Sequence, residues 1–209
     1  MKTTSPYLSI WFKPRATLEY LINKDPKRSV LALAALAGIA NALSRASSKN
    51  MGDRMDTLSI ILFSITLGPI YGIFGLYVIS AVTRSAGHML GGTASALHMR
   101  AVLAWASLPI ACELALWVPK LILGGSEMFT KRTPTLDAKP DLNTYFWAIL
   151  VVEILLIFWT FVIALKGIAL AQKFSSWKAL TNILLTFIFA TIFYLLFWVI
   201  TVGFALNLV

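Results

Sequence analysis

Residues 179–209 read ALTNILLTFIFATIFYLLFWVITVGFALNLV, a run of 31 positions without one charged side chain. An α-helix rises about 1.5 Å per residue, so about 20 apolar residues cross the hydrocarbon core of a bilayer, which is about 30 Å thick. This run is therefore long enough to form a transmembrane helix. The whole chain shares its character, because 58% of the residues are apolar and only 13% are charged, about half the charged share of an ordinary soluble domain.

Four further apolar segments remain when the chain is cut at its charged residues. They predict spans at 29–44, 57–83, 101–119 and 145–165, with the last span at 179–205. The second segment contains Gly68, Pro69 and Gly72, which predict a kink and a close-packed face. We therefore predict an all-α fold, a polytopic transmembrane bundle of five helices that forms one domain over residues 29–209.

Residues 1–28 precede the first predicted span. Between positions 7 and 22 they mix Trp, Tyr, Phe and Leu with Lys and Arg, a composition that predicts an amphipathic segment at the membrane interface. A solvated tail is the alternative. Eleven Lys and Arg fall on the side of the N-terminus and seven on the other side, so the excess of basic residues in cytoplasmic loops predicts a cytoplasmic N-terminus and an external C-terminus.

The remaining composition argues against several function classes. The net charge of +9 does not come from an aromatic-interleaved basic patch, so we expect no nucleic-acid partner. One cysteine and two histidines leave little for a metal site or an iron–sulfur cluster. We find no Ser-His-Asp or Cys-His arrangement, and we expect neither a cofactor nor enzyme activity.

Two carboxylates interrupt the apolar segments, Glu113 in the third and Glu153 in the fourth. A charge at the middle of a bilayer is costly, which makes such residues candidates for a functional site. Glu113 lies 13 residues after Arg100 and Glu153 lies 13 residues before Lys166, so both fall about 20 Å from the same face. The same offset in the other spans predicts one intramembrane polar site made of Asn41, Tyr71, Glu113, Glu153 and Thr191. The alternative is that the glutamates only fix helix packing.

Basic residues flank the predicted cytoplasmic loops 84–100 and 166–178, which contain no acidic residue. They are candidates for contact with anionic lipid head groups, although they could equally serve only to set the topology. The set comprises Arg84, Arg100, Lys166, Lys173 and Lys178.

The sequence resembles the Yip family of Ypt-interacting, five-span membrane proteins. Four pieces carry the resemblance: Pro14-Arg-Ala-Thr17 with Ile22; Arg84 to Arg100 with Gly91-Gly92 and Ser95; Trp105-Ala-Ser-Leu-Pro109; and Lys166-Gly167 with Phe174-Ser-Ser-Trp-Lys178-Ala179. The chain lacks a long polar N-terminal domain and is more similar to the compact prokaryotic members. The resemblance therefore implies a bacterial inner-membrane location, and a Rab-type GTPase partner is not expected.

These observations lead to two functional hypotheses. The first is a non-catalytic scaffold for membrane organisation or trafficking, which contacts lipid and associates with copies of itself or with another membrane protein. The second is a small transporter, channel or lipid-moving protein that uses the intramembrane site around Glu113 and Glu153. A polar cavity that reaches both glutamates would favour transport, and a packed bundle would favour the scaffold.

Overall fold

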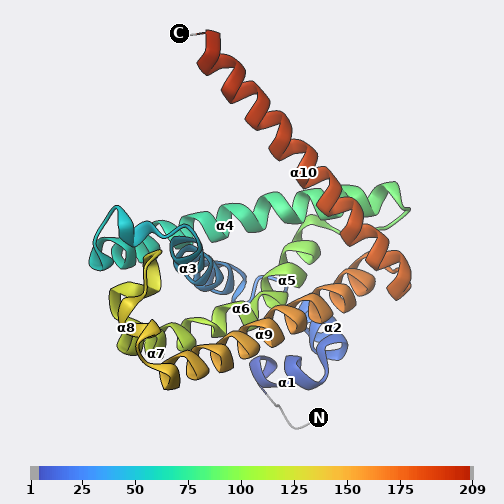
Figure 1. The fold of residues 1–209 in the computed structure, drawn as a ribbon. Coiled ribbons are helices and arrows are strands. Elements are labelled where there is room, and N and C mark those ends of the chain that lie inside the picture. The colour runs from blue at the N-terminus through green and yellow to red at the C-terminus, as the bar shows by residue number, and fades with distance from the viewer. Residues whose placement is uncertain (1–4, 208–209) are drawn as a thin grey trace.

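The computed structural model describes residues 5–207, with the backbone alone described at residues 140 and 202–207. The described residues form helices and no strand (Figure 1). Two of the elements are short 3₁₀ helices. The elements are α1 Pro6–Phe12, α2 Pro14–Lys24, α3 Val30–Ser48, η1 Met51–Asp53, α4 Thr57–Met89, α5 Ala96–Ala106, α6 Leu108–Cys112, α7 Leu114–Gly124, η2 Gly125–Phe129, α8 Pro134–Asp137, α9 Pro140–Gln172 and α10 Ser176–Asn207.

Five helical segments are long and apolar enough to cross a membrane, namely α3, α4, the series Ala96–Phe129, α9 and α10. The all-α fold with five spans is therefore confirmed. Helices α4 and α9 extend past the predicted ends, since they run to Met89 and begin at Pro140. Cutting at charges shortens a span artificially, because long basic side chains are tolerated within its last turns.

The third span is interrupted twice, at Ser107 between α5 and α6 and at Glu113 between α6 and α7. Pro109 explains the first break. It occupies the first turn of α6, where its missing N–H would have no intrahelical partner in any case, whereas the middle of a helix would lose a hydrogen bond. The second break places Glu113 at a helix junction.

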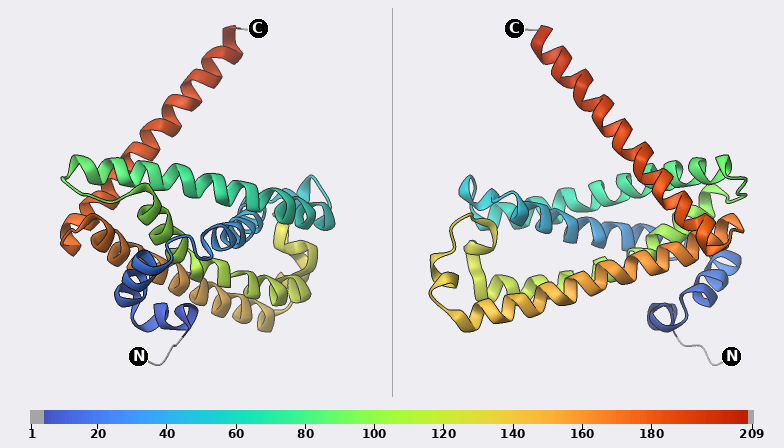
Figure 2. Two further views of the ribbon diagram at one scale, coloured as in Figure 1. Left: turned by 180° about the vertical axis from the view of Figure 1, so that it is seen from behind. Right: turned by 45° about the vertical axis from the view of Figure 1, so that its right-hand side comes forward.

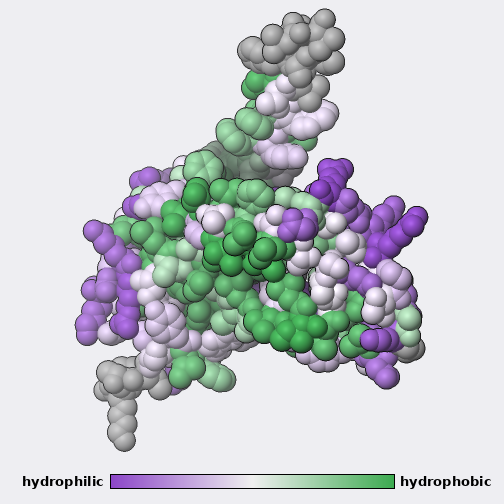
Figure 3. All heavy atoms as spheres, turned by 90° about the vertical axis from the view of Figure 1, so that its left-hand side faces the viewer, coloured by the Kyte–Doolittle hydropathy of each residue, from purple (hydrophilic) through white to green (hydrophobic). Residues whose placement is uncertain are grey.

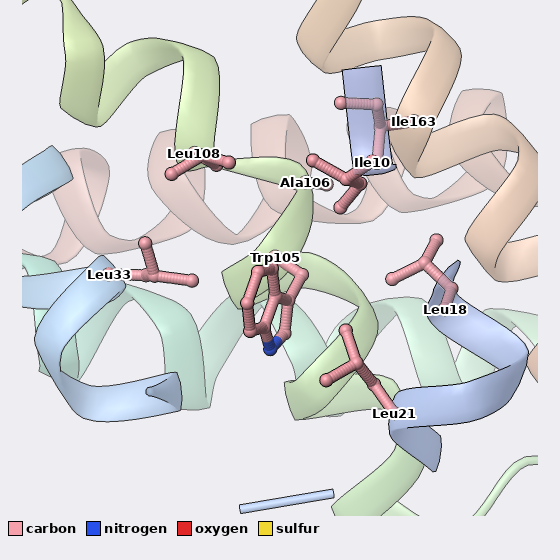
Figure 4. Close-up of a cluster of buried hydrophobic side chains, with 8 residues drawn as sticks. All are labelled: Ile10, Leu18, Leu21, Leu33, Trp105, Ala106, Leu108 and Ile163. Carbon is pink, nitrogen blue, oxygen red and sulfur yellow. The ribbon is translucent and has the colours of Figure 1, made fainter. Parts of the chain in front are cut away.

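Helices α1 and α2 pack against the bundle. Ile10, Leu18 and Leu21 are at most 1% exposed and lie in one cluster with Trp105 of α5 and Ile163 of α9 (Figure 4). Burying each of the three aliphatic side chains stabilises this packing by about 1.5–3 kcal/mol relative to leaving that side chain exposed to water. The described part of the N-terminal segment is thus held by the same core as the spans.

Helices α3 and α4 make the most extensive helix contact in the described chain. Gly38 of α3 faces Gly68 and Gly72 of α4, and a Cβ built at Gly38 would lie 2.8 Å from the backbone nitrogen of Gly72. Backbones can approach this closely only where side chains are absent. The close-packed face that the sequence predicted is therefore present.

Helix α10 packs along only its first part. Ala179, Asn182 and Thr186 are buried against α4 and α9, whereas residues 191–201 are all exposed. The helix then leaves the other elements and projects away from them (Figures 1 and 2). An apolar surface lies between two polar ends of the remaining bundle (Figure 3), as expected for a protein that spans a membrane.

Candidate functional site

Glu113 is positioned by the junction between α6 and α7. Its Oε1 atom accepts a hydrogen bond of 2.8 Å from the hydroxyl of Ser44 on α3. The glutamate thus lies at a break in the third span, and its side chain reaches across to a neighbouring helix. The hydrogen bond partly satisfies a carboxyl group that would otherwise be expensive in lipid.

Glu153 on α9 forms an ion pair with Lys120 on α7. Both side chains are largely buried, at 14% and 15% exposure, and the Lys120 ammonium also lies 4.8 Å from the centre of the Trp117 ring. Glu113 is close enough to Glu153 and Lys120 to interact with both electrostatically. The structure therefore brings the two glutamates into one neighbourhood, together with the oppositely charged Lys120.

Sequence reasoning missed two members of this cluster, Ser44 and Lys120. The predicted span 101–119 ends one residue before Lys120, because the predicted spans are delimited by charged residues. The structure continues α7 through Pro119 to Gly124, so Lys120 remains on a helix that faces α9. The signal available in the sequence was the continuation of apolar residues from Leu121 to Leu123.

An open pocket of about 310 Å³ reaches the ion pair. Lys120 and Glu153 line it, together with Ser47 from α3 and residues of the segment 128–150. Glu113 is not among the lining residues. The pocket thus gives access to one of the two glutamates from the end of the bundle that carries α8.

The other three residues of the predicted intramembrane site are exposed. Asn41 donates a hydrogen bond to the carbonyl oxygen of Ala37 on its own helix, and Tyr71 is 48% exposed with the guanidinium of Arg45 5.2 Å from its ring centre. Thr191 lies on the projecting part of α10. The offset of 13 residues specifies depth, but it does not specify rotation about the helix axis, and rotation decides which side chains meet.

The predicted head-group residues lie at the other end of the bundle, in varied surroundings. The Arg84 Nε atom donates to the carbonyl oxygen of Ala94, and Arg100 stacks 4.8 Å from the centre of the Tyr77 ring. Lys178 lies 4.8 Å from the centre of the Phe174 ring. Lys166 lines a second pocket, and Lys173 ends α9 in the left-handed conformation.

Gln172 organises this end of the bundle, and the sequence did not single it out. It is 1% exposed, accepts a 3.0 Å hydrogen bond from the Ala94 N–H and donates a longer one to the Arg84 carbonyl oxygen. Gly87 permits this arrangement, because a Cβ there would overlap the side-chain amide of Gln172 and would lie 2.7 Å from Asn182 Nδ2. The glutamine therefore ties α9 to α4 and to the loop after α4.

Among the residues that the structure describes, no group of three His, Cys, Asp or Glu side chains could hold a metal ion. A family model described as the Yip1 domain matches residues 8–200. No curated protein and no solved structure matches the chain in the same comparisons.

Proposed function

The chain belongs to the Yip1-domain family, and on that premise we propose that this multi-pass membrane protein is a non-catalytic scaffold that organises the membrane through contacts between helices and with lipid. Its proposed location is a bacterial inner membrane, with the N-terminus on the cytoplasmic side, where Lys and Arg are in excess. The scaffold would assemble through the projecting part of α10, in contact with a second copy of the chain.

The projecting part of α10 is the observation that carries this proposal. Phe193, Phe197 and Trp198 are each more than half exposed, and the first part of the same helix is anchored by Asn182 and Thr186. Anchoring at one end presents the other end away from the bundle at a set angle (Figure 2). Aromatic side chains bury large areas, so a second helix of this kind would find extensive contact there.

The states of the two glutamates support the same proposal. Glu113 bonds to Ser44 and Glu153 pairs with Lys120, and each contact joins two helices that are distant in sequence. Buried polar groups with partners on neighbouring helices hold a bundle in one arrangement. This is the use expected of them in a scaffold.

Cysteine cross-linking in membranes tests the assembly. Cys112 is first replaced by alanine, because it is exposed and would react. Phe193→Cys on α10 should then give a disulfide-linked dimer under mild oxidation, whereas Ile70→Cys on α4, which is 65% exposed, serves as the matched control and should remain monomeric. Equal cross-linking at both positions would show random collision and reject assembly through α10.

Transport is the second candidate, and the pocket at Lys120 and Glu153 is the observation that favours it. A charged pair that can be reached from outside the bundle could bind and release a polar solute or a proton. A proton flux into proteoliposomes, reported by a pH-sensitive dye, that is lost in Glu153→Gln and retained in Glu19→Gln would support this function. Equal flux in empty liposomes and in liposomes with the wild-type protein would exclude it for protons.

A further inference from the structure

A second open pocket, of about 370 Å³, lies between the N-terminal helices and α9. Three cationic side chains line it, Lys13 and Arg15 at the start of α2 and Lys166 near the end of α9. All three are exposed. Only Lys166 belongs to the head-group set that the sequence suggested, because residues 13–15 and 166 become neighbours through the packing of α2 on α9.

The positive charge of this pocket has no counter-charge. No carboxylate lines it, and Glu19, one turn along α2 from Arg15, is not among its residues. Among the described residues, Lys120 and Glu153 form the only ion pair with a nitrogen–oxygen distance within 4.0 Å. An anion that entered the pocket would therefore meet three cations that are free of internal ion pairs.

The backbone adds to the attraction for an anion. Helix α2 begins at Pro14, and its N-cap residue Lys13 makes no side-chain capping bond. The first hydrogen bond into the helix runs from the Thr17 N–H to the Lys13 carbonyl oxygen. The amides of Arg15 and Ala16, both lining residues, thus belong to the orphan donors of a first turn, where the helix dipole favours negative charge.

Large apolar side chains also line the pocket. They are Phe12, which is 86% exposed, and Trp159 and Val162 of α9. Trp159 and Val162 precede Lys166 by seven and four residues, or about 10 and 6 Å along the helix, in the direction of the bilayer centre. The indole N–H of Trp159 is buried and has no hydrogen-bond partner among the described residues.

We propose that this pocket binds one anionic phospholipid. Its phosphate would lie among Lys13, Arg15 and Lys166 at the start of α2, and an acyl chain would follow Phe12, Trp159 and Val162 toward the membrane interior. A free phosphate would use only the cationic lining residues, whereas a phospholipid matches both the cationic and the apolar lining residues. The site is separate from α10, so its occupancy does not depend on assembly of the scaffold.

Lipid binding to the purified full-length chain in detergent, measured by native mass spectrometry, tests the proposal. Phosphatidylglycerol should bind at one site and more tightly than phosphatidylcholine, whose head group is neutral overall. The double variant Arg15→Gln/Lys166→Gln should weaken phosphatidylglycerol binding about thirtyfold, which corresponds to two cations at about 1 kcal/mol each. Both side chains are exposed, so the fold should be retained.

Two controls separate this site from general attraction. The variant Lys24→Gln/Lys27→Gln removes the same charge from exposed positions of the N-terminal segment outside the pocket, and it should change binding by less than about twofold. Phe12→Ser should weaken binding of phosphatidylglycerol while Lys13, Arg15 and Lys166 are intact. Equal losses in the two double variants, equal binding of the two lipids, or full displacement by millimolar inorganic phosphate would overturn the proposal.

Discussion

Replacing Gly38 by alanine probes the contact between α3 and α4 most directly. The added Cβ would lie 2.8 Å from both the Cα and the nitrogen of Gly72, and closer still to the carbonyl oxygen of Gly68. Ordinary van der Waals contact begins at 3.4 Å, so the two helices must separate by at least the difference, 0.6 Å. The obstacles are backbone atoms, which cannot rotate away as the end of a side chain would.

The magnitude follows from two opposing effects. Overpacking of a tight contact costs about 1–3 kcal/mol, whereas the change from glycine to alanine within a helix contributes up to about 1 kcal/mol in the other direction. The net expectation for Gly38→Ala is a loss of about 1–2 kcal/mol in the free energy of unfolding. Gly75 provides the matched control on α4, because a Cβ there meets no atom within 4 Å; Gly75→Ala should therefore stabilise the protein by about 0.4–1 kcal/mol.

The assay is reversible unfolding in mixed micelles with increasing dodecyl sulfate, followed by tryptophan fluorescence. The two variants should shift the midpoint in opposite directions. A Gly38→Ala protein as stable as the Gly75→Ala protein would show that α3 and α4 do not approach at Gly38, and the reasoning about their packing would be wrong.

Three further predictions concern polar contacts. Lys120→Met should lower stability by roughly 3 kcal/mol, because it leaves Glu153 largely buried and unpaired; the double variant Lys120→Met/Glu153→Leu should recover most of this loss, and additive losses in chemical unfolding would contradict the pairing. Gln172→Leu should cost about 1–3 kcal/mol, since it orphans a buried N–H, and should speed hydrogen exchange at that amide; unchanged exchange would argue against the contact. Asp56 accepts hydrogen bonds from the backbone N–H and hydroxyl of Ser59, which hold its pKa below the usual 3.8. The ionised form is therefore stabilised in the fold, so Asp56→Ala should lower the melting temperature at pH 7, with a difference that shrinks as the pH falls below 3.8; a constant difference would refute the capping role.

The number and the approximate limits of the spans could be predicted from the sequence. Backbone groups inside a bilayer must bond internally, so long uncharged segments have little choice but to be helices. Gly68 and Gly72 also indicated a close helix contact, and the structure identifies Gly38 of α3 as their partner. The break at Ser107 in the third span could not be predicted from the sequence, because Pro109 is compatible with either a kinked helix or a new helix start.

The candidate site was only partly within reach of sequence reasoning. Glu113 and Glu153 were conspicuous because charge is rare in the spans, but their partners Ser44 and Lys120 were not. Depth in the membrane can be counted along a helix. The neighbours of a side chain depend also on how each helix is rotated and tilted, and Asn41, Tyr71 and Thr191 are exposed in the structure.

The amino-acid sequence by itself determined that this chain is an all-helical membrane protein with five spans, because the free energy of placing charge and unbonded backbone in lipid restricts the choice so strongly. Only the tertiary structure decided which apolar faces meet other helices and which do not. Lipid tails are as apolar as leucine side chains, so a face for packing and a face for lipid have the same composition. For that reason the departure of α10 from the bundle and the meeting of residues 13–15 with Lys166 could be seen only in the folded chain.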